Sequence, residues 1–198
     1  MLDRNGAWEA VLENAYDIIV TGEINGEDTL SFKIPYRDGK RGYIDSEKKI
    51  QIVDDVYKVR TVTDTRDTDG SAVTEVYAEA EFYDLTFSVR KEERTFEAEY
   101  PETAMAYALE GTEWGVGTVT VRTKRTWTST EKNALSILRN TADLHGGDLV
   151  FDCPNRLVHL LTVNGRDSGA LFAYRKNMKS IQRVVDTREL VTRPVSYT

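Results

Sequence analysis

The stretch that decides the fold is residues 18–35, IIVTGEINGEDTLSFKIP. Two runs rich in β-branched and apolar residues, 18–24 and 29–35, flank the dipeptide Asn25-Gly26. Such residues favour extended strands, and Asn-Gly tolerates the positive φ angles of a type I′ turn. The pattern therefore predicts an antiparallel hairpin that turns at Asn25 and Gly26.

The residues that follow continue the strand pattern. Apolar side chains surround an expected turn at Asp54-Asp55, and the alternation of VYKVRTVT (56–63) runs toward the polar loop 66–70. Residues 73–85 then predict a returning strand. Long strands joined by tight turns favour an antiparallel sheet or barrel over a fold that alternates strands with helices.

The middle of the chain changes character and predicts two helices. The first begins at Pro101, because proline fits a first helical turn, and carries one apolar stripe before Gly111. The second runs from Thr128, which with Glu131 would form a capping box, to the glycine pair 146–147.

Strand patterns flank the second helix. The segment VGTVTVRT (116–123) alternates, and DLVFDCPNRLVHLLTVNG (148–165) predicts a hairpin that turns at Pro154-Asn155. From Leu171 onward the apolar positions indicate strands again. The order of elements is β, then α+β, then β, which predicts an α+β fold that is predominantly antiparallel β.

Composition restricts the class of protein. Of the 198 residues, 40% are hydrophobic and 30% charged, the balance of a soluble globular protein. No apolar run approaches the roughly 20 residues of a transmembrane helix, and the acidic N-terminus lacks signal-peptide features, so we expect no membrane contact and synthesis in the cytoplasm. The net charge of -7 opposes phosphate binding, so no specific nucleic acid is expected as a partner.

Candidates for catalysis are few. Only His145 and His159 could serve as the base of a Ser-His or Cys-His arrangement. His145 lies at an expected helix end, which favours capping, and His159 lies in an expected strand, which favours packing. The single cysteine, Cys153, is interpreted as a small buried hydrophobe. The sequence therefore predicts no catalytic residue.

No metal or cofactor site is predicted either. The loop DTRDTDG (64–70) would place Thr65 first and Val76 twelfth in an EF-hand register, and neither can ligate calcium there. His145 and Asp148 lack further ligands at a recognisable spacing. The glycines of GTEWGVG (111–117) match no phosphate-binding loop.

Four segments, in order along the chain, carry a family resemblance. They are LENAYDIIVTGEINGEDTLSFKIPY (12–36), YIDSEKKIQIVDDVYKVRTV (43–62), ALEGTEWGVGTV (108–119) and ALFAYRKNMKSIQRVVDTRELVTR (170–193). Together they resemble the N-terminal region of the tail-associated lysin family of siphophages and prophages, also called prophage endopeptidase tail or phage minor structural proteins, and are similar to tailed-phage baseplate hub proteins.

The residues that match this family's motifs are taken as structural. They are Asn25, Gly26, Phe32, Gly111, Thr112, Trp114, Gly117, Tyr174, Asn177, Thr192 and Arg193. The chain departs from the pattern at Arg175, where the family usually has glycine, and at residues 194–198, which replace the usual continuation.

The resemblance implies a hub-like β-barrel tube domain with an inserted small α+β domain. Residues 1–90 would form the β-rich domain, completed by strands at 170–198, and residues 91–169 would form the insertion with its two helices. By the same resemblance the chain would close the tail tube and dock on the distal tail protein and other tail proteins. We expect a homotrimer in the assembled virion tail, a monomer as an isolated fragment, and no enzyme activity, because peptidoglycan cleavage in the family belongs to further C-terminal domains.

Two alternatives from other classes stay open. Exposed tryptophans such as Trp8 or Trp127 could stack on sugars in a carbohydrate-binding module for host recognition. A peptidoglycan-degrading endopeptidase fragment would need a pocket with an acid, base or metal that the residue patterns do not predict.

Overall fold

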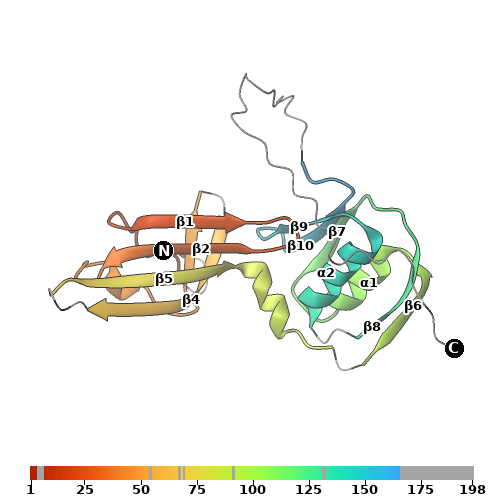
Figure 1. Cartoon of the computed structure of the whole chain (residues 1–198), viewed down its shortest axis with the longest axis horizontal. Coiled ribbons are helices and arrows are strands. Elements are labelled where there is room, and N and C mark those ends of the chain that lie inside the picture. Colours follow the sequence, from red (N-terminus) through yellow and green to blue (C-terminus); the bar gives the residue numbers. More distant parts are fainter. Residues whose placement is uncertain are drawn as a thin grey trace, which may run out of the picture. The chain divides into compact units, whose positions relative to one another are not determined.

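The structure, a computed structural model, describes residues 1–3, 7–53, 55–66, 68, 70–90, 92–130 and 133–165. These residues contain a five-stranded sheet followed by a smaller α+β half, which together form the unit Met1–Asn164 (Figure 1). The strands predicted over 170–198 lie outside the described residues, as do four of the motif residues: Tyr174, Asn177, Thr192 and Arg193.

The first half is an antiparallel sheet. Its strands, in spatial order, are β1 (Tyr16–Gly22), β2 (Asp28–Pro35), β5 (Ala72–Ala80), β4 (Asp55–Arg66) and β3 (Lys49–Ile52). A short 3₁₀ helix, η1 (Arg41–Tyr43), precedes β3. Alternate residues of the central strands point to one face and form its core: Leu30, Phe32, Ile34, Tyr57, Val59, Val76, Ala78 and Ala80.

The predicted hairpin is confirmed, although its turn is of another type. Val20 pairs with Leu30, and Gly22 pairs with Asp28. Asn25 has a φ of 58°, but Gly26 does not enter the positive region, whereas a type I′ turn needs positive φ at both central residues. The single left-handed position falls on asparagine, which tolerates it better than most residues.

The sheet is curled. Ile18 of β1 and Ile50 of β3 come from opposite ends of the strand order, yet both line one apolar cavity of about 230 Å3. The N-terminal segment covers the β3 end, where the N–H of Leu2 donates to the carbonyl of Lys49 at 2.7 Å. Met1 and Leu2 are buried there. A closed barrel stays a prediction.

The strand predicted at 73–85 is shorter than expected. β5 ends at Ala80, and the chain continues as the 3₁₀ helix η2 (Glu81–Phe87) toward the second half. Phe82 and Leu85, three residues apart, are both buried, and the ring of Phe82 stacks on that of Phe151 with centroids 4.0 Å apart. The three-residue spacing suits a 3₁₀ helix, because residues at that interval share one face.

The second half mixes strands and helices. In chain order its elements are β6 (Arg94–Glu99), α1 (Pro101–Leu109), β7 (Gly115–Val119), β8 (Arg125–Ser129), α2 (Ala134–His145), β9 (Asp148–Asp152) and β10 (Leu157–Leu161). One sheet has the order β7-β10-β9 with β7 parallel to β10, and a second consists of β6 and β8. The hairpin predicted over 148–165 is confirmed as the antiparallel pair β9 and β10.

The first predicted helix is confirmed, but the start predicted for the second is wrong. Thr128 lies in β8 and pairs with Thr95 of β6. The helix begins at Ala134, where the side chain of Asn133 accepts a hydrogen bond from the N–H of Ser136 at 2.8 Å. Pairing with a distant strand therefore overrides the local capping signal at Thr128. The predicted end is right, and Gly146 has a φ of 76°.

Candidate assembly surface

The tip of the β1–β2 hairpin is fastened to the start of β9. The side-chain nitrogen of Asn25 donates to the carbonyl of Gly147 at 3.0 Å, and the side-chain oxygen accepts from the N–H of Leu149 at 2.6 Å. The amide thus pairs with backbone groups as a neighbouring strand would. This contact joins the two halves of the described unit.

Gly26 strengthens the same junction through its carbonyl. The guanidinium of Arg139, on α2, donates to this oxygen at 2.7 Å, and the hydroxyl of Tyr83 donates to it at 3.5 Å. Arg139 also lies over the Tyr83 ring, 5.7 Å from its centroid. We call these contacts of Asn25 and Gly26 the hairpin clamp. It uses two of the motif residues in holding the fold together.

Gly117 is required by the ring of His159. A Cβ atom at this position would lie 2.6 Å from two atoms of the imidazole, closer than such contacts occur. The ring is fixed in place, because its Nδ1 accepts a hydrogen bond from the N–H of Thr118 at 2.8 Å. Packing between β7 and β10 therefore excludes any side chain at Gly117.

The GTEW segment ends α1 and leads into β7. Gly111 has a φ of 70°, in the left-handed region that favours glycine. The hydroxyl of Thr112 donates to a carbonyl in the last turn of α1 at 2.7 Å and accepts from the N–H of Trp114 at 3.1 Å. Trp114 is buried and meets Phe151 edge-on, and Phe32, the last motif residue described, lies in the core of the first sheet.

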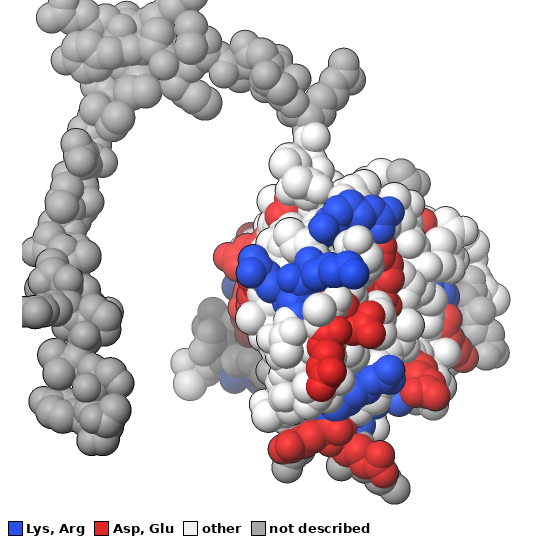
Figure 2. Space-filling view, turned by 90° about the vertical axis from the view of Figure 1, so that its right-hand side faces the viewer, with Lys and Arg blue, Asp and Glu red and all other residues white. Residues whose placement is uncertain are grey.

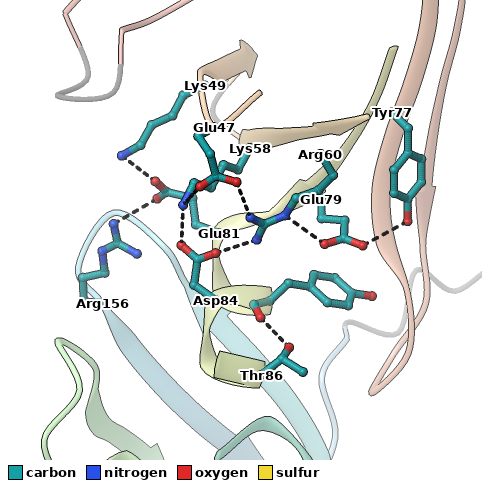
Figure 3. Close-up of polar contacts among 11 residues, drawn as sticks. Glu47, Lys49, Lys58, Arg60, Tyr77, Glu79, Glu81, Asp84, Thr86 and Arg156 are labelled. Atoms are coloured by element: carbon teal, nitrogen blue, oxygen red, sulfur yellow. Dashed lines mark hydrogen bonds and ion pairs between the residues drawn. The ribbon is translucent and has the colours of Figure 1, made fainter. Parts of the chain in front are cut away.

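Arg60, on β4, is the centre of an ion-pair network (Figure 3). Its guanidinium pairs with Glu47 at 3.1 Å, Glu79 at 3.1 Å and Asp84 at 2.5 Å. Lys58 pairs with Glu47 at 2.6 Å and Asp84 at 3.1 Å. We call these five residues the Arg60 network. It holds β4 against β5 and η2.

A second group of charges lies beside this network (Figure 3). Glu81, at the start of η2, is buried, and its carboxylate pairs with Lys49 at 2.6 Å and with Arg156 at 3.4 Å. Burying an unpaired charge is very costly, so the two cations are what makes Glu81 tolerable there. The pairs connect β3 to the turn between β9 and β10.

The pKa values of the Arg60 network suit ion pairing rather than acid catalysis. The hydrogen bond from Lys58 lowers the pKa of Glu47 below its ordinary value. Burial would raise the pKa of Asp84, but hydrogen bonds from Arg60 and Lys58 outweigh burial and the pKa is lowered. A general acid at neutral pH needs a raised pKa, so these carboxylates are unsuited to that role.

The two histidines are bound to backbone. His145 is buried at the end of α2, and its Nδ1 lies 3.0 Å from the carbonyl of Thr123. The Thr123 hydroxyl donates to the carbonyl of His145 at 3.0 Å, so the capping expected of the imidazole is supplied by threonine. Burial lowers the pKa of His145, although the bond to Thr123 opposes this shift. His159 accepts from Thr118, as described above.

The remaining candidates for chemistry also bind within the fold. Cys153 is half-buried, and burial together with nearby Glu81 and Asp28 raises the pKa of its thiol to about 11, which disfavours the reactive thiolate. Asp64 accepts from the hydroxyl of Thr74 at 2.6 Å and pairs with Arg41. Within the described ranges, no group of three or more His, Cys, Asp or Glu is arranged to hold a metal.

The tryptophans differ in exposure. Trp8 is 65% exposed beside the apolar cavity at the curled end of the sheet. Trp127 packs against Phe96, with ring centroids 4.9 Å apart, and Trp114 is buried. Figure 2 shows a face on which charges of both signs lie side by side. Arg122 and Glu102 of the α+β half form an exposed ion pair. Such mixing does not favour phosphate binding.

One end of the first sheet is an exposed apolar strand. β1 ends the strand order, and Ile18, Ile19 and Val20 are 52%, 59% and 49% exposed. An uncovered edge with these side chains is a template for pairing with another chain. β1 is therefore the strongest candidate for an assembly contact. No helix among the described residues is long and apolar enough to cross a membrane.

Comparisons with known proteins give the family context. Residues 1–80 match the family model described as prophage endopeptidase tail N-terminal domain, and residues 88–160 match the one described as prophage endopeptidase tail domain. No curated protein matches the chain.

Two solved structures have a similar fold. The prophage tail protein gp18 from Listeria monocytogenes EGD-e has 13% sequence identity and a TM-score of 0.72, over 90% of this chain and 55% of that one. A tail protein from Neisseria meningitidis MC58 has 12% identity and a TM-score of 0.53, over 80% of this chain and 48% of that one. The chain thus spans about half the length of these two proteins.

Proposed function

The chain belongs to the prophage endopeptidase tail family, and from this premise we propose that it is a structural hub of the phage tail tip. In this role it would form a homotrimeric ring in the virion tail, close the tail tube and dock on the distal tail protein. Residues 170–198 would complete the β-rich domain, with the α+β half as an insertion. The motif residues would serve structure, not chemistry.

One observation carries this proposal: among the described residues, the histidines and the acids of the ion-pair clusters are engaged in holding the fold. The histidines bind backbone, and the acids of the Arg60 network and Glu81 are in ion pairs. Enzymes instead bring an acid, base or nucleophile together at a cavity. Polar contacts that fix the two halves in place support a structural role for the chain as a subunit of an assembly.

The test is the mass of the chain in solution. Light scattering across a size-exclusion peak would be measured for the chain alone and mixed with the distal tail protein from the same genome. The chain alone is expected to be a monomer that elutes as a complex with the distal tail protein, and a trimer of the chain would support the ring directly. A chain that stays monomeric and does not bind the distal tail protein at high concentration would contradict the hub role. Zymography on cell walls tests the enzyme alternative, for which we expect no clearing.

Exposed Trp8 favours one second candidate, a carbohydrate contact for host recognition. The indole lies beside an apolar cavity, and aromatic faces stack on sugar rings. Trp127 is a weaker candidate because Phe96 covers part of its ring. Binding to cell-wall glycans that disappears in folded Trp8→Ala, but persists in Trp127→Ala, would support this function over the hub role.

A further inference from the structure

The two edge strands of the curled sheet, β3 and β1, differ in what lies beside them. At the β3 end, Leu2 exchanges backbone hydrogen bonds with Lys49, at 2.7 Å and 3.3 Å. At the other end, β1 has β2 on one side only, and no strand of the described residues lies on its outer side (Figure 1). Among the described residues, β1 is therefore the open edge of this sheet.

The side chains of β1 are apolar on both faces. Val20 pairs with buried Leu30 and points to the inner face, whereas Ile19 pairs with Ser31 and points to the outer face. Ile18, two residues before Val20, points to the same inner face and lines the apolar cavity. Among the described residues, no strand lies beyond these side chains on the outer side of β1, where an added strand would pair with it.

β1 has few of the devices that keep edges from pairing, and the one charge that it carries, Asp17, lies near its start. Edge strands of soluble proteins usually carry lysine, proline or inward-pointing charges. Tyr16–Gly22 contains no lysine or proline, and its one bulge sits at the start and leaves the rest of the strand regular. The regular part of β1 is therefore suited to pairing with another strand.

The acidic residues around β1 favour a partner strand with basic ends. Between residues 7 and 32 the chain has no Lys or Arg, and its acidic residues there are Glu9, Glu13, Asp17, Glu23, Glu27 and Asp28. Asp17 lies at one end of β1, and Glu23 follows the other end. Asp17 is 3.4 Å from Lys33, but Glu23 is in no ion pair among the described residues. A partner strand with basic ends would be favoured.

We propose that β1 receives an extended apolar segment with basic flanks from another tail protein, which pairs with it by strand addition. This proposal depends on the proposed function in one respect only, namely that the segment belongs to another tail protein. Backbone hydrogen bonds would supply affinity, the three apolar side chains would select alternate apolar residues, and the acids would select the basic ends.

The probe is a synthetic peptide in which Val and Thr alternate over the length of β1, with Lys pairs at both ends. Binding to the full chain is measured by fluorescence anisotropy. Two further versions carry N-methyl groups on alternate amides, one for each edge of the peptide. Strand addition uses only one edge, so we expect one methylated version to lose binding and the other to keep it.

Variants of the chain test the charge selection. Asp17→Asn with Glu23→Gln should weaken binding about tenfold, because charges at the rim of the contact are removed. The matched control, Glu97→Gln with Glu113→Gln, makes the same change of charge on exposed residues of the α+β half and should leave binding unchanged. A peptide with Glu in place of Lys should not bind.

Three results would overturn the inference. The Lys-flanked peptide does not bind, both methylated peptides bind as well as the parent, or the chain forms a concentration-dependent oligomer that Ile19→Lys abolishes. The last result would assign β1 to a second copy of the chain. Failure of peptide binding alone leaves the ring and its complex with the distal tail protein to be judged by mass, so the two proposals fail separately.

Discussion

The side-chain oxygen of Asn25 accepts a hydrogen bond from the backbone N–H of Leu149 at 2.6 Å, although 124 positions separate the two residues. We expect Asn25→Ala to lower the free energy of unfolding by about 3 kcal/mol. Two hydrogen bonds are lost at about 1 kcal/mol each, and alanine in a left-handed conformation costs about 1 kcal/mol more. Urea unfolding followed by circular dichroism measures the change.

Asn25→Gly separates the two contributions. Glycine adopts the positive φ without strain but cannot make the hydrogen bonds, so the loss should be smaller than with alanine. If both variants unfold at the same urea concentration as the unaltered chain, the hairpin clamp does not stabilise the fold.

Gly117→Ala tests the contact with His159. The new Cβ would lie 2.6 Å from the imidazole, so we expect a loss of about 1–3 kcal/mol from overpacking. Gly115→Ala is the matched control in the same strand, because its nearest neighbour, a methyl of Leu157, is 3.4 Å away. Equal melting temperatures for the two variants would contradict the steric explanation.

Arg60→Met should destabilise the sheet by about 2 kcal/mol. The substitution keeps much of the side-chain length but leaves Glu47, Glu79 and Asp84 near one another with less positive charge. Arg122→Met, which removes an exposed ion pair with Glu102, should change stability by less than about 0.5 kcal/mol. Thermal unfolding of both variants at neutral pH makes the comparison, and similar losses would argue against a special role for Arg60.

His145 predicts a pH dependence of stability. Burial lowers its pKa in the folded state below the ordinary value of about 6.5, so the unfolded chain takes up this proton first as pH falls. The stability contributed by neutral His145 is complete above about pH 6.5 and is lost as pH falls below it toward the folded pKa. In His145→Gln the midpoint of urea unfolding should change less between pH 7 and about pH 5.5.

Local signals in the sequence predicted which helices and strands are present better than where each of them begins and ends. Asn25-Gly26 correctly predicted the hairpin, but the turn type follows from the bonds that Asn25 makes with Gly147 and Leu149, which no local pattern contains. The capping signal at Thr128 misled because β6, more than thirty residues earlier, pairs with that segment. Long-range contacts are the common cause of both errors.

The candidate assembly surface was harder to predict from the sequence than the fold was. In the sequence, IIV at 18–20 predicts a strand but not its place in the sheet, because apolar content alone does not reveal whether a strand is central or at the edge. The Arg60 network was equally hidden. Lys58, Arg60 and Glu79 alternate with apolar residues along strands as any exposed face does, and Glu47 and Asp84 lie outside the strands. The motif residues were predicted as structural, and for those among the described residues the partners became known only in three dimensions.

The hairpin clamp has a kinetic consequence. Its two sides are formed at different times during translation, because Asn25 leaves the ribosome long before Gly147 and Leu149. At roughly 5–20 residues per second, this delay lasts about 6–25 s. The tip of the β1–β2 hairpin therefore spends that time without its clamp, and contacts this distant in sequence form late in folding. Loss of the clamp should then speed unfolding more than it slows folding, so the main effect of the clamp is to keep the folded chain from opening.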